Sequence, residues 1–188
     1  MRAGMNYYGL TDAGTPTFDP THERKHPMKT SELTGPALDW AVAKGEGKYL
    51  VFFDEYFTRN GLASGKSQAR VESMLDYQPL KGKWCWLNRI GGAVAIPNYS
   101  TDWSQGGPII EEDIFKLFRN VGGSWTAQIK KRVPYYSPTY DADIGADEIL
   151  SKAGPTPLIA AMRCYCCAKL GDEVEIPEEL QPCQQLNP

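Results

Sequence analysis

Excess positive charge and long apolar runs are both missing from this 188-residue chain. It carries 20 Lys and Arg against 23 Asp and Glu, a formal net charge of −3, and its basic residues are scattered. Binding to a phosphate backbone usually needs a basic face, so we expect no nucleic-acid partner. No run approaches the roughly 20 apolar residues that span a bilayer, and the N-terminus has no basic-then-apolar signal. We therefore expect no membrane association and a cytoplasmic location.

Histidine is scarce, and this limits the chemistry that the chain can perform. The only two, His22 and His26, lie in an N-terminal stretch rich in turns, so a Ser–His or Cys–His nucleophile would lack its base in the folded body. Neighbouring carboxylates such as Asp54 and Glu55 have no partner cluster, and adjacent surface carboxylates usually only interact with solvent. The sequence favours a protein that binds rather than catalyses and needs no cofactor, with a hydrolase as the open alternative.

Two motifs resemble a metal site and a nucleotide-binding loop, but neither has the residue spacing that such a site requires. The five cysteines are odd in number, and Cys164, Cys166 and Cys167 fall in one predicted helix without the second ligand pair that zinc needs. Residues 61–67 resemble a phosphate-binding P-loop, but Asn60 stands where the first glycine belongs, so the spacing is one residue short. We expect reduced thiols, no metal and no nucleotide hydrolysis.

The pattern of turns and apolar residues predicts an α+β fold. With 18 Gly and 14 Pro, we expect short elements with many connections. Residues 1–27 read as an irregular leader, 28–180 as a single α+β domain with an insertion at about 48–87, and 181–188 as a tail. The domain is predicted to have a mainly antiparallel sheet of about four to six strands, with N-terminal and C-terminal helices packed on one face.

Individual elements follow from periodicity and turn residues. Helices are predicted at 30–44, capped by Thr34, and from Thr156 to a stop at Gly171. The remaining assignments are strands at 48–57 and 83–87, a hairpin of 114–118 and 124–129, loops at 59–65 and 97–105, one helical turn at 109–113, and a long loop at 133–154 with a short helical turn at 147–152.

The candidate ligand site is centred on residues 101–110, and Trp125 and Arg163 are predicted to complete it. This segment joins a carboxylate, an indole, an amide and two glycines whose backbone N–H groups would reach a ligand. The predicted ligand-binding residues are Asp102, Trp103, Gln105, Gly106, Gly107, Trp125 and Arg163. Asp102 and Gln105 would orient the ligand, Trp103 would stack on it and Arg163 would offset negative charge. The alternative is that the tryptophans are core residues and the glycines serve turns.

Several segments resemble the NinX-like phage proteins, a domain family of unknown function. They are residues 29–44 (KTSELTGPALDWAVAK), 99–111 (YSTDWSQGGPIIE), Trp125 and 154–177 (GPTPLIAAMRCYCCAKLGDEVEIP). The resemblance covers about residues 28–180 and departs from the family in the leader and the insertion. It implies a phage or prophage origin, action in the host bacterial cytoplasm and a small accessory role during infection, without assigning a reaction.

Two functions remain open at this point. The leading hypothesis is a phage accessory protein that binds a small nucleotide-like or anionic ligand and antagonises a host defence signal. The alternative is a protein-interaction module that inhibits or redirects a host factor through exposed Tyr and Trp in residues 133–140 and in the insertion. The sequence is compatible with a homo-oligomer that has a ligand site between subunits.

Overall fold

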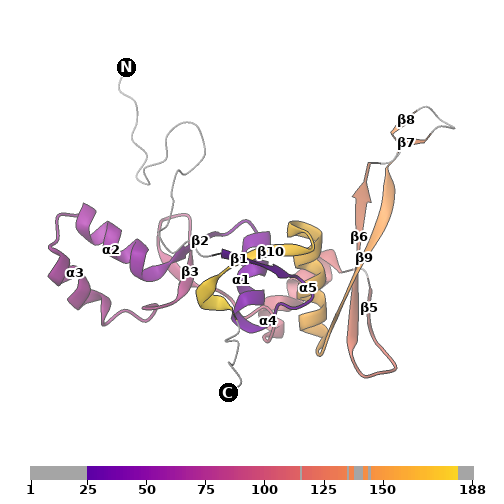
Figure 1. Cartoon of the computed structure of the whole chain (residues 1–188), viewed down its shortest axis with the longest axis horizontal. Helices are drawn as coiled ribbons and strands as arrows, with labels where there is room; N and C mark the ends of the chain where they lie inside the picture. The colour runs from indigo at the N-terminus through magenta and orange to yellow at the C-terminus, as the bar shows by residue number, and fades with distance from the viewer. Residues whose placement is uncertain (1–24, 115, 135, 138–141, 144, 182–188) are drawn as a thin grey trace. The chain divides into compact units, whose positions relative to one another are not determined.

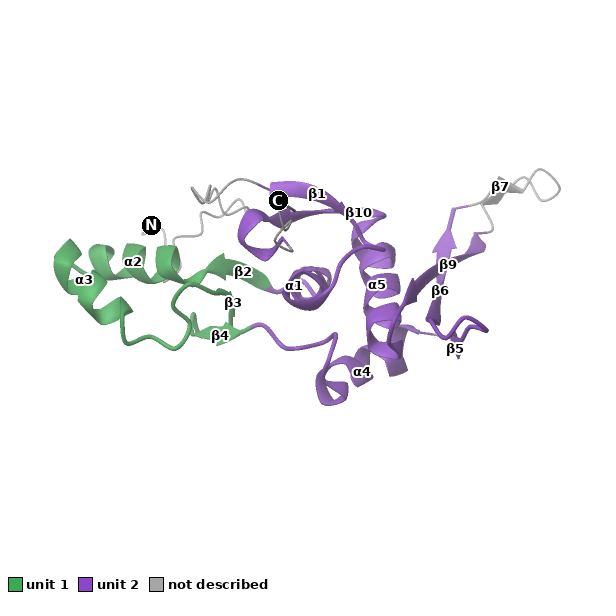
Figure 2. Ribbon diagram, turned by 60° about the horizontal axis from the view of Figure 1, so that its bottom comes forward, with its two compact units in different colours: residues 1–24, 49–95 green, residues 25–48, 96–188 purple. Residues whose placement is uncertain are grey.

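The computed structural model describes residues 25–181 except 115, 135, 138–141 and 144 (Figure 1). The described residues form two compact units, one of 49–95 and the other of 25–48 with 96–181 (Figure 2). The predicted leader lies outside the described residues up to position 24, and its last three residues, 25–27, are part of a strand. The predicted tail lies outside them from 182 onward.

Two buried helices form the centre of the larger unit. Helix α1 spans Gly35–Gly45, with Thr34 at its N-cap position and Pro36 in its first turn, so the predicted helix is confirmed with a later start. Helix α5 spans Pro157–Leu170. Its predicted ends are also confirmed, because Thr156 Oγ1 accepts from Ile159 N at 3.2 Å and Gly171 follows with φ of 98°. The two helices pack against each other.

An antiparallel three-stranded sheet packs on α5. It consists of β5 (Lys116–Arg119), β6 (Trp125–Val133) and β9 (Ala146–Gly154), in the order β5-β6-β9. Figures 1 and 2 show α5 on one side of β6 and β9, with α1 beyond α5 on that same side. The α+β fold with antiparallel strands is confirmed, as is the hairpin of β5 and β6, in which Arg119 lies opposite Trp125.

The loop predicted for 133–154 is wrong over most of its described length. Strand β6 runs on to Val133, and β9 occupies the residues assigned to a loop and a helical turn. β9 carries charged residues, and its two large apolar residues, Ile149 and Leu150, are adjacent and point to opposite faces, so its sequence does not alternate clearly between apolar and polar residues. The long pairing with β6, which no local pattern reveals, makes it a strand.

The predicted single sheet is divided among several smaller ones. In the larger unit, β1 (Lys25–Lys29) pairs antiparallel with β10 (Glu173–Pro177), which leads into the short 3-10 helix η1 (Glu178–Leu180). A two-residue pair, β7 (Tyr136–Ser137) with β8 (Ala142–Asp143), lies between β6 and β9 in the chain. The described strands therefore pair in separate groups and do not form one continuous sheet.

The smaller unit is a three-stranded antiparallel sheet with a pair of helices. Its strands are β2 (Tyr49–Phe52), β3 (Trp84–Leu87) and β4 (Ala93–Ala95), in the order β2-β3-β4. Helices α2 (Phe53–Ala63) and α3 (Gln68–Leu75) connect β2 to β3. The core gathers around Val51, Phe53 and Cys85.

Two predictions in this unit need correction. The strand predicted for 48–57 ends at Phe52, and α2 replaces both its second half and most of the loop predicted for 59–65. Gly61, in the P-loop-like segment, belongs to α2, and a Cβ there would come within 2.6 Å of Val71 Cγ2. The glycine therefore lets α2 and α3 approach closely, and no phosphate-binding nest forms around it.

Candidate functional site

Helix α4 (Trp103–Asp113) occupies the segment that the sequence assigned to a ligand-binding loop. Gly106 and Gly107 lie inside this helix, where Gly106 N donates to Asp102 O at 2.9 Å. A Cβ on Gly106 would come within 2.4 Å of Tyr99 O and 2.7 Å of Leu158 Cδ2. The helical turn predicted for 109–113 is therefore confirmed as the second half of a longer helix, whereas the loop predicted for 97–105 ends at Asp102. Gly and Pro108 lower helix propensity locally, and packing overrides it.

Asp102 caps this helix rather than standing free. Its Oδ1 accepts from Ser104 N at 2.8 Å and from Ser104 Oγ at 2.7 Å, and its Oδ2 accepts from Gln105 Nε2 at 3.0 Å. The Ser104 side chain, followed by the Ser104 backbone, holds the pKa of Asp102 below its usual value. Gln105 Oε1 accepts in turn from Asn98 N at 2.5 Å. Both side chains hold the start of α4 in place.

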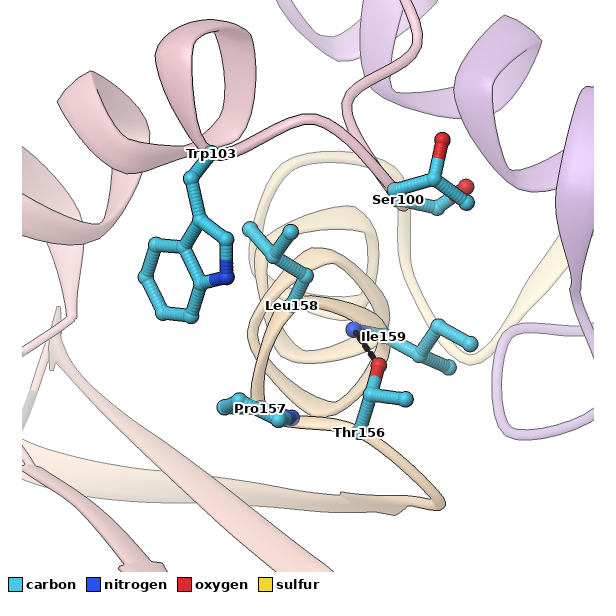
Figure 3. A pocket seen from close by; sticks show the side chains of 7 residues that line it. Ser100, Trp103, Thr156, Pro157, Leu158 and Ile159 are labelled. Atoms are coloured by element: carbon cyan, nitrogen blue, oxygen red, sulfur yellow. Dashed lines mark hydrogen bonds between the residues drawn. The ribbon is translucent and has the colours of Figure 1, made fainter.

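Trp103, the first residue of α4, forms one wall of a small pocket. The pocket has a volume of about 240 Å³ and is lined by Ser100, Thr101, Trp103, Thr156, Pro157, Leu158 and Ile159. Figure 3 shows the indole on one side and the first turn of α5 opposite, with Leu158 and Pro157 beside the ring. Trp103 is 54% exposed. The lining is mostly apolar, with hydroxyl groups from Thr101 and Thr156, a combination that suits a flat ring with polar edges.

A buried carboxylate on α1 holds the loop that leads into the pocket. Asp39 is only 7% exposed, and its Oδ1 accepts from Ser100 N at 2.7 Å. Burial raises the pKa of Asp39 above its ordinary value, although the hydrogen bonds from Ser100 act in the opposite direction. The Ser100 Oγ atom is also buried. Asp39 thus couples α1 to the residues that line the pocket.

The other two predicted site residues lie outside the pocket lining. Trp125 is half-buried on β6, opposite Gly154 of β9. Arg163 on α5 donates from Nε to Leu33 O at 2.9 Å and from Nη1 to Ala153 O at 3.0 Å. Burial lowers the pKa of its guanidinium. Five of the seven predicted residues therefore lie together, one at the N-cap of α4 and four within that helix. Of the predicted set, Trp103 is the residue that lines the pocket.

Asp39, Ser100 and the start of α5 belong to this region, although the sequence did not indicate them as site residues. One signal was present, because Asp39 is the single charged residue in the otherwise apolar stretch 37–43 of a predicted helix. A carboxylate on such a face needs a hydrogen-bond partner from elsewhere in the fold. The apolar first turn of α5 gave no comparable signal, since Leu158 and Ile159 look like ordinary core residues.

The arrangement of the described cysteines and carboxylates bears on metal and thiol chemistry. No group of three or more His, Cys, Asp or Glu side chains there is placed to hold a metal ion. The four described cysteines are buried and form no disulfide with one another, and burial raises the pKa of Cys85 and Cys164 to about 11. Cys183 lies outside the described residues. Among the helices of the described chain, none has the length and apolar content that a membrane span requires.

Fold and pocket together define a class: a small α+β protein with an apolar pocket where the first turns of α4 and α5 meet. Comparison with known protein families shows which family within that class the chain belongs to. A family model described as Bacteriophage P22, NinX matches residues 29–169, so the chain belongs to this phage protein family. The resemblance noted in the sequence is thereby confirmed. No curated protein matches the chain.

Proposed function

We propose that this phage accessory protein binds a small ligand with a planar ring, of the nucleobase type, in the Trp103 pocket. The main observation behind the proposal is the Trp103 indole, which is half-exposed and lines an apolar pocket. A ring stacked on Trp103 would bury apolar area on both sides against Pro157 and Leu158. The Thr101 and Thr156 hydroxyls supply polar groups at the ring edge.

The N-termini of α4 and α5 favour a ligand whose ring carries an anionic group. Trp103 is the first residue of α4 and Pro157 the first of α5, so the positive ends of both helix dipoles lie at the pocket. Asp102 already neutralises part of this field at α4, whereas α5 is capped by the uncharged Thr156. We therefore place the ring against Trp103 and a phosphate near the start of α5. A volume of about 240 Å³ suits the ring alone, with the remaining ligand outside.

Sequestration of such a ligand gives the protein a role in infection. In the host cytoplasm, a protein that binds a nucleotide signal without consuming it lowers the free concentration of that signal and thus antagonises the defence that it triggers. The phage family membership and the binding proposal together support this role.

A thermal-shift screen tests the binding proposal. The purified chain is heated with mono-, di- and cyclic nucleotides and ADP-ribose derivatives, because a ligand that binds only the native state raises the melting temperature. We expect a saturable rise that Trp103→Ala abolishes and Trp103→Phe retains in part. Trp125→Ala, which removes an indole outside the pocket, serves as the matched control and keeps the rise. A flat screen with cooperatively unfolding protein would contradict the proposal.

A second candidate function, a protein-interaction module, has its own supporting observation. In the smaller unit, Tyr77 is 87% exposed and Ile90 is 85% exposed, and Tyr49 is also exposed. Aromatic side chains at the surface are common anchors of interfaces. Of the other proposed anchor segment, 133–140, several residues lie outside the described part of the chain. A pull-down from host lysate that returns a stoichiometric partner, lost on Tyr77→Ala and kept on Trp103→Ala, would favour this candidate.

A further inference from the structure

Strand β9 lies at the edge of its sheet and has one open side. In the order β5-β6-β9, β9 pairs with β6 along its whole length, and no strand of the described chain pairs with its other side. Of its nine residues, only Gly154 is buried, and the strand contains no proline. Native sheets usually shield an edge of this length with a short strand, a proline or a bulge. The open side of β9 is therefore a candidate for pairing with a further strand.

The hairpin of β6 and β9 also continues past the elements that cover it. β5 pairs with β6 only from Trp125 to Gln128, whereas β9 pairs with β6 as far as Val133. Figure 2 shows the far ends of β6 and β9 extending beyond α5. A two-stranded ribbon is only marginally stable in water by itself. The extended end of the hairpin would therefore gain stability from a third strand along β9.

The side chains of β9 indicate which strand fits it. Glu148, Leu150 and Lys152 point to the α5 side of the sheet, since Leu150 lies opposite the buried Ile129. In an antiparallel pairing of two copies about Leu150, Glu148 of each copy lies opposite Lys152 of the other, and the two leucines meet between these pairs. Opposite charges across two strands stabilise the pairing, and like charges destabilise it. The strand is therefore complementary to itself.

Other symmetric pairings of β9 match its side chains less well. Two-fold symmetry centres the pairing on one residue, because directly opposed residues point to the same face of a sheet. A centre at Glu148 or Lys152 places like charges opposite each other. A centre at Ile149 or Ser151 places Leu150 opposite a charged residue. Among centres from 148 to 152, only Leu150 matches apolar with apolar and acidic with basic residues.

We propose that β9 pairs antiparallel with β9 of a second copy of this chain, centred on Leu150, to form a two-fold homodimer. The two sheets would join into one, in the order β5-β6-β9 followed by β9-β6-β5 of the second copy. Charged side chains on an edge strand discourage pairing with unrelated strands, and here they match only in the self-pairing. The interface does not depend on the Trp103 pocket.

The interactions that β9 already makes are compatible with this pairing. Lys152 Nζ donates to Asp172 Oδ1 at 2.5 Å, and the lysine side chain is 20% exposed. An ammonium has three N–H donors, so Glu148 of the second copy can share it. Leu150 O and Ala153 O accept from side chains of α5, and each carbonyl oxygen has a second lone pair for a strand partner.

Sedimentation equilibrium of the purified chain tests the proposal, over protein concentrations from about 1 μM to about 1 mM. We expect the mass to rise from one chain to two and no further. Glu148→Lys should raise the dissociation constant of the dimer at least about tenfold, because like charges replace both opposite pairs. Glu112→Lys makes the same change of charge at an exposed position of α4 and should leave the constant unchanged. A monomer at every concentration, or equal effects of the two substitutions, would overturn the proposal.

Cysteine substitutions on the other face of β9 test the same pairing without changing its charge. Ile149 and Ser151 are exposed, and each would lie opposite the other across the interface. In a Cys183→Ser background, a mixture of Ile149→Cys and Ser151→Cys chains should form a disulfide-linked heterodimer under mild oxidation. Either variant alone should not, because its own two cysteines would lie diagonally, beyond the roughly 7 Å between Cα atoms that a disulfide spans. No cross-link in the mixture, or equal cross-linking of either variant alone, would contradict the pairing about Leu150.

Discussion

At the scale of single residues, Gly106 and Gly107 are adjacent on α4 and have opposite surroundings. A Cβ on Gly106 would collide with Tyr99 O and Leu158 Cδ2, whereas a Cβ on Gly107 would meet no atom within 4 Å. We predict that Gly106→Ala lowers the free energy of unfolding by about 1–3 kcal/mol through overpacking. Gly107→Ala should raise it by roughly 0.5–1 kcal/mol, because alanine favours a helix. Urea denaturation measures both, and equal effects of the two substitutions would contradict the described packing of α4.

Asp39 gives the fold a pH dependence of unusual sign. Because burial raises its pKa in the folded state, the folded protein binds a proton more readily than the unfolded chain does. This carboxyl group therefore lowers stability as pH rises from the ordinary aspartate range through its folded pKa. Asp39→Asn keeps an acceptor for Ser100 N and removes the charge. We predict a stabilised variant at pH 7 whose advantage disappears as pH falls below the ordinary aspartate range.

Asp39→Ala is the matched variant that removes the acceptor as well. With Ser100 N left unpaired in a buried position, it should be less stable than Asp39→Asn by about 1–3 kcal/mol. Urea denaturation at pH 7 and at pH 3.5 measures all three proteins. A gain for Asp39→Asn that is the same at both pH values would show that the carboxylate does not pay a burial cost in the folded state.

At the scale of elements, Arg163 links three of them. From α5 it donates to Leu33 O, just before α1, and to Ala153 O, near the end of β9. We predict that Arg163→Ala lowers the free energy of unfolding by about 2–3 kcal/mol without any ligand present, because two hydrogen bonds from a charged group are lost. Arg163→Lys should recover only part of it, since one ammonium cannot reproduce the guanidinium geometry. A loss of ligand binding with unchanged stability would instead support the role that the sequence suggested.

Elements with strong local signals could be predicted, and those made by long-range packing could not. Thr156, Pro157 and Gly171 mark the ends of α5, and the glycines 122 and 123 mark the β5-β6 turn, as the sequence predicted. The first half of α4 was missed because Gly106, Gly107 and Pro108 oppose helix formation locally, while the close approach to Leu158 requires a glycine at position 106. β9 was missed because its own sequence does not alternate clearly, and its pairing with β6 spans the intervening residues 134–145, which carry no hairpin-turn signal. Of the two pocket walls, the start of α5 was predicted as a helix end, whereas the start of α4 was predicted as a loop.

At the scale of the whole molecule, the two units differ in the size of their cores. The smaller unit buries Val51, Phe53 and Cys85, with partly buried residues around them, whereas the larger unit contains extensively buried α1 and α5. A unit with a small core opens at a lower free-energy cost. We predict that amides of β2 and β3 exchange with solvent at least about tenfold faster than amides of α5 in hydrogen-exchange mass spectrometry. Equal protection in both units would contradict this order of stability.

The same experiment locates the ligand within the molecule. A nucleotide bound in the Trp103 pocket should slow exchange at the starts of α4 and α5 and leave the smaller unit unchanged. Slower exchange confined to 49–95 would favour the protein-interaction surface of that unit instead.

The most direct test of the central claim is the indole N–H resonance of Trp103 in a two-dimensional NMR titration with the nucleotide that gives the largest thermal shift. Trp103→Phe assigns the resonance, and Trp125, which lies outside the pocket lining, is the internal reference. Binding in the Trp103 pocket predicts a saturable movement of the Trp103 signal and little movement of the Trp125 signal. A protein stabilised by the nucleotide with its Trp103 signal unmoved, or with Trp125 moving in its place, would contradict the assignment of the ligand site to this pocket.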